Sequence, residues 1–162
     1  IEQTFGSRLM VRGFLLNNEL TDFNFQPNAG GGPVANRAEP GKRPRSSMSP
    51  MLVFDGDGRV VMAIGSPGGP NIIGYVAKTL IAALDWKRNI QKAIDFPNVT
   101  NRNGPLYIEK GSRFEKLKPA LEKLGHTVRL STRQSGLNGV MVTKDGLEGG
   151  TDKRREGVAL GD

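Results

Sequence analysis

Apolar residues recur at helical spacing in one segment near the middle of the chain. They follow the turn Pro67-Gly68-Gly69 and comprise Ile72, Ile73, Val76, Ala77, Leu80, Ile81 and Leu84. Steps of three and four residues place such side chains on one face, and Pro70 suits the first turn of a helix. The pattern therefore predicts a buried helix that begins directly after a glycine turn.

Short apolar runs with turn signals predict strands elsewhere. The sequences MLVF and RVVMAIG flank DGDG, which favours the positive φ of tight turns, so residues 51–65 are expected to form a β-hairpin. A second hairpin is expected in GVMVTKDGLEGG, through Asp145-Gly146. The run RLMVRGFLL, residues 8–16, reads as a single strand that enters a polar stretch at Asn17.

The rest of the chain repeats this alternation of strands and helices. LYIEK and TVRL read as strands, and between them a helix is expected to begin at the cap Ser112 and to end at Gly125. Its apolar face would hold Phe114, Leu117, Leu121 and Leu124. Hairpins interrupted by separate helices predict an α+β fold rather than a repeat of βαβ units.

Composition adds limits on size and organisation. The chain has 162 residues, enough for one domain with a real core, and we expect a single domain over residues 1–162. Residues 26–41 contain four glycines and three prolines. Such a composition cannot support a core, so a flexible, lid-like loop is expected over residues 24–41. The first residue is Ile1 rather than methionine, which suggests that an upstream segment has been removed.

The net charge of +7 raises the question of a nucleic-acid partner. The basic residues are spread over a loop at 42–45, a predicted surface helix at 110–123 and the stretch 153–155, and aromatic residues make up only 6%. This distribution predicts no nucleic-acid partner. No apolar run approaches the roughly 20 residues of a membrane span. Without cysteine, the composition leaves open a cytoplasmic, periplasmic or extracellular location.

The stretch NNELTDF places two carboxylates, Glu19 and Asp22, directly after an apolar run. Such a pair could hold an ammonium group or act as acid and base. It could also belong to a polar turn that Asn17 and Asn18 cap. No histidine or cysteine lies nearby and the spacing is not that of an EF-hand, so neither a metal site nor a cofactor is predicted.

The stretch RSSMSP offers three hydroxyls, on Ser46, Ser47 and Ser49, beside basic residues. Hydroxyl donors in a positive potential suit a carboxylate, although a polar serine loop is equally compatible with the pattern. A serine nucleophile would require a histidine base, and the one histidine, His126, follows a helix-ending glycine. A Ser-His-Asp triad is therefore not expected.

The stretch GSPGG joins a predicted strand to the predicted helix. Glycine N–H groups at the start of a helix can bind an anion or an oxyanion, and here they would belong to Gly68 and Gly69. A tight strand-to-helix turn would also explain these glycines. The lysine and spacing of a P-loop are absent.

Taken together, these motifs resemble the small subunit of the gamma-glutamyltranspeptidase family of N-terminal-nucleophile hydrolases. The resemblance runs through TFGS, GFLLNNELTDF, GKRPRSSMSP, GSPGG and TDKRREG, and so covers most of the chain. It implies an αββα sandwich, of which this chain would be the C-terminal portion of the small subunit without its first strands. It also implies a precursor that cleaves itself, so that a new N-terminal threonine becomes the nucleophile and its own amino group the base.

The resemblance also implies roles for individual residues. Glu19 and Asp22 match positions that hold the α-amino group of a γ-glutamyl donor such as glutathione, Ser46 and Ser47 match those that take its α-carboxylate, and Gly68 and Gly69 match the oxyanion hole. Glu2 falls where the family usually has an asparagine that contacts the donor amine. The expected partners are a large subunit from the same precursor, a γ-glutamyl donor, and water or an amine or peptide acceptor.

The chain departs from the family pattern in two further ways. The family's catalytic threonine lies about two dozen residues before the TFGS-like segment, so the nucleophile is expected outside this chain, which alone should be inactive. Residues 24–41 contain no tyrosine to close over the site. Two alternatives stay open: an acylase for glutaryl or cephalosporin-type side chains, and an inert or ligand-binding fragment.

Overall fold

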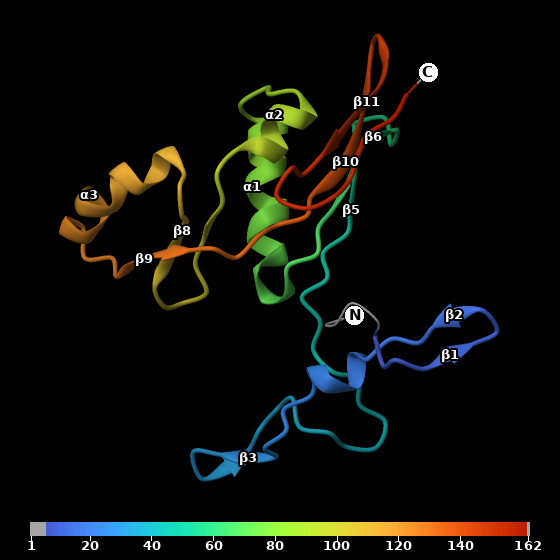
Figure 1. Cartoon of the computed structure of the whole chain (residues 1–162), viewed down its shortest axis with the longest axis vertical. Helices are drawn as coiled ribbons and strands as arrows, with labels where there is room; N and C mark the ends of the chain where they lie inside the picture. The colour runs from blue at the N-terminus through green and yellow to red at the C-terminus, as the bar shows by residue number, and fades with distance from the viewer. Residues whose placement is uncertain (1–5, 162) are drawn as a thin grey trace. The chain divides into compact units, whose positions relative to one another are not determined.

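The computed structural model describes residues 6–161. The chain divides into two compact units, Ile1–Ser46 and Ser47–Asp162. Figure 1 traces both units along the chain. The single domain expected over residues 1–162 stays a prediction. Glu2 lies outside the described residues.

The first unit begins with a small hairpin where a single strand was predicted. Strands β1 (Met10–Val11) and β2 (Phe14–Leu15) pair antiparallel, and both turn residues between them, Arg12 and Gly13, have positive φ values of 49° and 88°. Two successive positive φ values make the tight turn that hairpins favour. The prediction of one strand over residues 8–16 is therefore wrong, because Arg12 adopts a conformation that its residue type gives no reason to expect.

A second hairpin lies inside the segment predicted as a lid. Strands β3 (Asn28–Ala29) and β4 (Gly32–Pro33) pair across a turn in which Gly30 and Gly31 have positive φ. The short helix η1 (Glu19–Asp22) precedes this segment. The segment thus contains local structure, and its role as a flexible lid stays a prediction.

A four-stranded antiparallel sheet forms the framework of the second unit, in the order β11-β10-β6-β5. Its strands are β5 (Met51–Phe54), β6 (Val60–Gly65), β10 (Asn138–Thr143) and β11 (Gly146–Thr151). Both predicted hairpins are confirmed. In the first, the Asp55 carboxylate accepts hydrogen bonds from the N–H groups of Asp57 and Arg59, which closes the loop.

Helices α1 (Ile72–Leu84) and α2 (Ile90–Asp95) cover one face of this sheet (Figure 1). The predicted helix is confirmed as α1, preceded by the short helix η2 (Gly69–Asn71). The core between helices and sheet consists of Met62, Ile64, Ile72, Tyr75, Val76, Ala82, Ala83, Ile90, Ala93, Ile94 and Leu137.

Helix α2 was not predicted. Glycines in strands β10 and β11 let it pack closely against the sheet. A Cβ atom on Gly139 would lie 3.1 Å from Ile90 Cδ1, and one on Gly150 would lie 3.0 Å from Ile94 Cδ1. The side-chain amide of Gln91 also pairs with the backbone of Thr151, donating to its carbonyl at 2.9 Å and accepting from its N–H at 3.0 Å. Long-range contacts of this kind stabilise a helix of six residues that would be marginal alone.

A second, three-stranded sheet has the order β7-β8-β9. It contains β7 (Val99–Thr100), β8 (Leu106–Glu109) and β9 (Val128–Ser131), and β8 pairs parallel to β9. Between β8 and β9 the chain forms η3 (Arg113–Leu117) and α3 (Lys118–Lys123). The predicted cap is confirmed, since Ser112 Oγ accepts from the Phe114 N–H, and Gly125 follows the helix with φ 89°.

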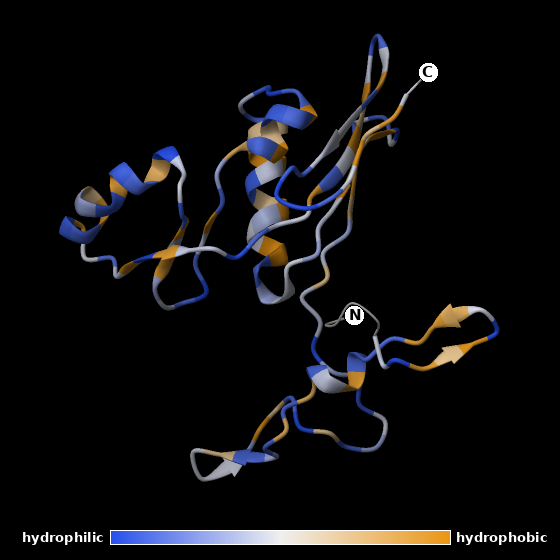
Figure 2. Ribbon diagram, viewed as in Figure 1, coloured by the Kyte–Doolittle hydropathy of each residue, from blue (hydrophilic) through white to orange (hydrophobic). Residues whose placement is uncertain are grey.

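The other face of the four-stranded sheet carries exposed apolar side chains. Leu52, Val140 and Val142 alternate with residues that face the core, and Figure 2 shows hydrophobic stretches along the strands of this sheet among polar ones. Contiguous exposed apolar surface of this kind marks an interaction face. Within residues 6–161, no helix is both long and apolar enough to cross a bilayer.

Lys78 of α1 forms hydrogen bonds to the C-terminal end of α2. Its Nζ donates to the carbonyls of Phe96 at 2.8 Å and Ile94 at 3.2 Å. Burial, with a contribution from the charge of Arg154, lowers the pKa of Lys78 to about 8. Between that pH and the ordinary value of 10.5, the folded protein binds fewer protons than the unfolded chain.

We therefore expect Lys78 to raise the melting temperature of the complete protein as the pH rises from about 8 toward 10.5. A Lys78→Met variant should lack this contribution. Thermal unfolding of both proteins across this pH range measures the difference. If the melting temperatures of the two proteins change with pH in parallel, Lys78 is not the group that causes the pH dependence.

Candidate active site

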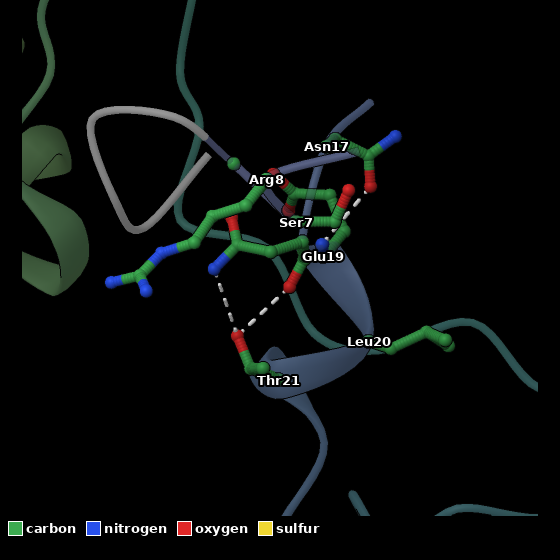
Figure 3. Close-up of a pocket in the computed structure, with 8 residues that line it drawn as sticks. Ser7, Arg8, Asn17, Glu19, Leu20 and Thr21 are labelled. Atoms are coloured by element: carbon green, nitrogen blue, oxygen red, sulfur yellow. Dashed lines mark hydrogen bonds between the residues drawn. The ribbon is translucent and has the colours of Figure 1, made fainter. Parts of the chain in front are cut away.

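The first unit contains a pocket of about 410 Å³ beside helix η1. Its lining consists of Gly6, Ser7, Arg8, Asn17, Asn18, Glu19, Leu20 and Thr21, most of which are labelled in Figure 3. Glu19 is therefore a pocket residue. Since Arg8 also lines the pocket, groups of both charges border the same space.

The asparagines around Glu19 shape the turn that carries it. Asn17 Oδ1 accepts a hydrogen bond from the Glu19 N–H at 3.0 Å, and the Thr21 hydroxyl donates to the Asn18 carbonyl at 2.8 Å (Figure 3). Both bonds use the side chain to satisfy backbone groups of a short turn. The structure thus contains a polar turn that Asn17 caps, whereas the Asn18 side chain makes no capping hydrogen bond. Glu19 in this turn also lines the pocket, and its role as a binding residue stays a prediction.

Asp22 lies at the other end of η1, outside the eight residues that line the pocket. It is half-buried, and its backbone carbonyl accepts a hydrogen bond from Asn36 Nδ2 at 2.7 Å. Glu19 and Asp22 thus belong to the same helical turn, but only Glu19 lines the pocket.

Ser46 and Ser47 fall at the boundary between the two units. Ser46 is exposed and Ser47 half-buried, and the carbonyl of Ser47 accepts from Ser49 Oγ at 3.1 Å. Among the basic residues before them, Lys42 pairs with Glu39 and donates to the Ala35 carbonyl. The ammonium of Lys42 is thus engaged within its own loop.

Gly68 and Gly69 lie in the second unit, where strand β6 leads into α1. Both have positive φ, 142° and 55°. Within residues 6–161, no carbonyl or side chain accepts a hydrogen bond from either N–H. Both N–H groups thus lack an acceptor among the described residues, directly before and at the start of η2, which leads into α1 (Ile72–Leu84).

The core enforces glycine at position 68. A Cβ atom there would lie 2.6 Å from Cε2 of Tyr75, a side chain that is only 2% exposed. The positive φ adds strain for any other residue. A glycine at 68 is therefore explained by packing as well as by a need for backbone donors.

A polar network that the sequence did not reveal lies next to this turn. Ser66 Oγ accepts from the Gly136 N–H at 3.1 Å, and Asp152 Oδ2 accepts from Ser135 Oγ at 2.5 Å and from the Leu137 N–H at 3.2 Å. Asp152 thus holds the segment that contacts the glycine turn. The motif TDKRREG contained this residue, but only the long-range contacts show what it binds.

Asp152 is only 2% exposed. Burial opposes its ionisation, but hydrogen bonds from Ser135 and from the N–H groups of Arg154 and Leu137 outweigh it and hold the pKa of Asp152 below its ordinary value. Arg154 pairs with Asp152 at 3.0 Å and with Glu109 at 2.8 Å. The network therefore pairs its buried charges.

No group of histidine, cysteine and carboxylate side chains suited to a metal ion occurs among residues 6–161. His126 is exposed, after α3.

Comparisons with known proteins agree with this arrangement of motifs. The family model described as gamma-glutamyltranspeptidase matches residues 1–162. The chain belongs to the gamma-glutamyltranspeptidase family. It is 36% identical to the glutathione hydrolase proenzyme of Bacillus subtilis strain 168 over 99% of its own length, and 37% identical to that of Escherichia coli K12 over 95%.

These relatives are longer proteins. The chain spans 27% and 28% of their lengths, about a quarter. Among solved structures, gamma-glutamyltranspeptidase from Pseudomonas nitroreducens complexed with L-DON matches with a TM-score of 0.80 and 30% identity, covering 98% of this chain and 88% of that one. The α+β fold of the N-terminal-nucleophile hydrolase type is thereby confirmed for this member of the family.

Proposed function

We propose that the complete protein transfers the γ-glutamyl group of glutathione-like amides to water or to an amine or peptide acceptor. The Oγ of a threonine outside this chain attacks the γ-carbonyl carbon, and the amine leaves with a proton. Water or the acceptor amine then attacks the resulting ester and releases the threonine. The threonine's own α-amino group serves as the base for both steps.

The observation that carries this proposal is that the N–H groups of Gly68 and Gly69, in a member of this family, have no acceptor among residues 6–161. Each of the two attacks creates a tetrahedral oxyanion, and preorganised backbone donors stabilise charge that appears only in the transition state. Acyl transfer is a reaction class that uses such donors.

The substrate assignment depends on the carboxylates of η1. Glu19 lines a pocket and Asp22 lies in the same turn, so the pair offers negative charge to the α-ammonium of the donor. We assign the α-carboxylate to Ser46 and Ser47, whose hydroxyls can donate. Glu2 completes the proposed set of donor-binding residues from outside the described part of the chain.

We also propose a large subunit of the same precursor as the partner of this chain. The apolar outer face of the four-stranded sheet, with Leu52, Val140 and Val142, supports a partner that covers it. The relatives named as proenzymes are consistent with a precursor of two subunits.

The complete precursor, expressed and matured, tests the function. It should hydrolyse γ-glutamyl p-nitroanilide, and prefer it to glutaryl p-nitroanilide, which lacks only the α-amino group. Under this proposal the 162-residue chain alone should show no turnover, because the nucleophilic threonine is placed outside it. A preference for the glutaryl compound would indicate the acylase instead, and inactivity toward both would indicate an inert or ligand-binding protein.

A further inference from the structure

The side chain of Asn36 joins two segments of the first unit that carry proposed donor-binding residues. Its Nδ2 donates to the Asp22 carbonyl at 2.7 Å and to Asn24 Oδ1 at 3.1 Å, and its Oδ1 accepts from the Arg45 N–H at 2.9 Å. The amide thus uses its donor group and its acceptor in one half-buried position.

The partners of Asn36 lie far apart in sequence but next to the proposed site. The Asp22 carbonyl belongs to the last residue of η1, and Arg45 directly precedes Ser46. The β3–β4 ladder covers only Asn28–Ala29 and Gly32–Pro33, so it includes neither partner. The Asn36 amide is therefore a direct link between the η1 turn and the serine loop.

We infer that Asn36 is a positioning residue, which holds the Asp22 turn at a set distance from Ser46. The inference rests on the proposed function. In a γ-glutamyl donor the α-ammonium and the α-carboxylate are attached to the same carbon, so their two binding groups must keep one spacing to be used together. A glutaryl donor has no ammonium and depends less on this spacing.

Two substitutions in the complete enzyme test the role of Asn36. Asn36→Ala removes both links, whereas Asn36→Asp keeps an acceptor for the Arg45 N–H but cannot donate to the Asp22 carbonyl. Both should lower the ratio of kcat/KM for γ-glutamyl over glutaryl p-nitroanilide by about tenfold, mainly through a higher KM for the γ-glutamyl donor. If the glutaryl compound is not turned over, its constant as a competitive inhibitor takes its place.

Asn101→Ala provides a matched control. Asn101 also bridges backbone groups, donating to the Gly104 carbonyl at 2.8 Å and accepting from the Asn103 N–H at 2.9 Å, but in a loop of the second unit. This variant should keep the wild-type ratio even if it lowers the melting temperature. A residue that only stabilises the fold would behave in the same way.

The outcomes separate the inference from the function on which it rests. A wild-type enzyme without preference for the γ-glutamyl donor would overturn both. If the wild type has this preference and either Asn36 variant retains it in full, the positioning role is overturned and the proposed function stands. A reduced ratio in both variants, with an unchanged ratio in Asn101→Ala, supports the role.

Discussion

Replacing the Gly69 amide with an ester in the complete enzyme is expected to lower kcat by about 100- to 1,000-fold while KM stays nearly unchanged. The ester oxygen removes the N–H donor but keeps the backbone shape. A proline substitution would also remove the N–H, but Gly69 has φ 55° and proline requires about −65°. The ester, introduced by semisynthesis, is therefore the cleaner change.

The matched control is the same ester at Gly13, another glycine with positive φ, in the turn between β1 and β2. Its kcat should equal that of the wild type. Steady-state kinetics with γ-glutamyl p-nitroanilide gives both constants. A folded Gly69 ester that binds the donor and retains the wild-type kcat would show that Gly69 serves only as a strand-to-helix turn.

The Asp22→Asn variant of the complete enzyme is expected to lose at least about 100-fold in kcat/KM for γ-glutamyl p-nitroanilide relative to the glutaryl compound. Removing one partner of a buried charge pair costs about 3–5 kcal/mol, and 1.4 kcal/mol corresponds to a factor of ten. Asparagine keeps the shape of the side chain. The glutaryl donor has no ammonium to lose, so its constants should change little.

Asp57→Asn is the control for this substitution, because Asp57 pairs with Arg59 in the exposed loop between β5 and β6. Exposed pairs contribute little, so neither donor should be affected. Equal losses for both donors in Asp22→Asn would mean that Asp22 supports the fold and does not bind the amine.

Both predictions concern residues that the sequence indicated by type and order. The β5–β6 hairpin and helix α1 were also predictable, because Asp-Gly turns and apolar residues at helical spacing act over a few neighbouring positions. By contrast, the β1–β2 turn requires a positive φ at Arg12, and a sequence with arginine there suggests a continuous strand. The conformational preference of the residue type therefore gave the wrong prediction at Arg12, where the backbone conformation is unusual for arginine.

The sequence by itself determined the family, the α+β class and the identity of the proposed site residues, since each depends on short motifs and their order. The tertiary structure alone decided that Glu19 lines a pocket, that the Gly68 and Gly69 N–H groups have no acceptor among the described residues, and that Asn36 joins the Asp22 turn to Arg45. It also decided the partners of Asp152, which binds Ser135. The physical reason is range: a hydrogen bond between groups 14 or 17 positions apart depends on how the whole unit packs, and no local pattern encodes it.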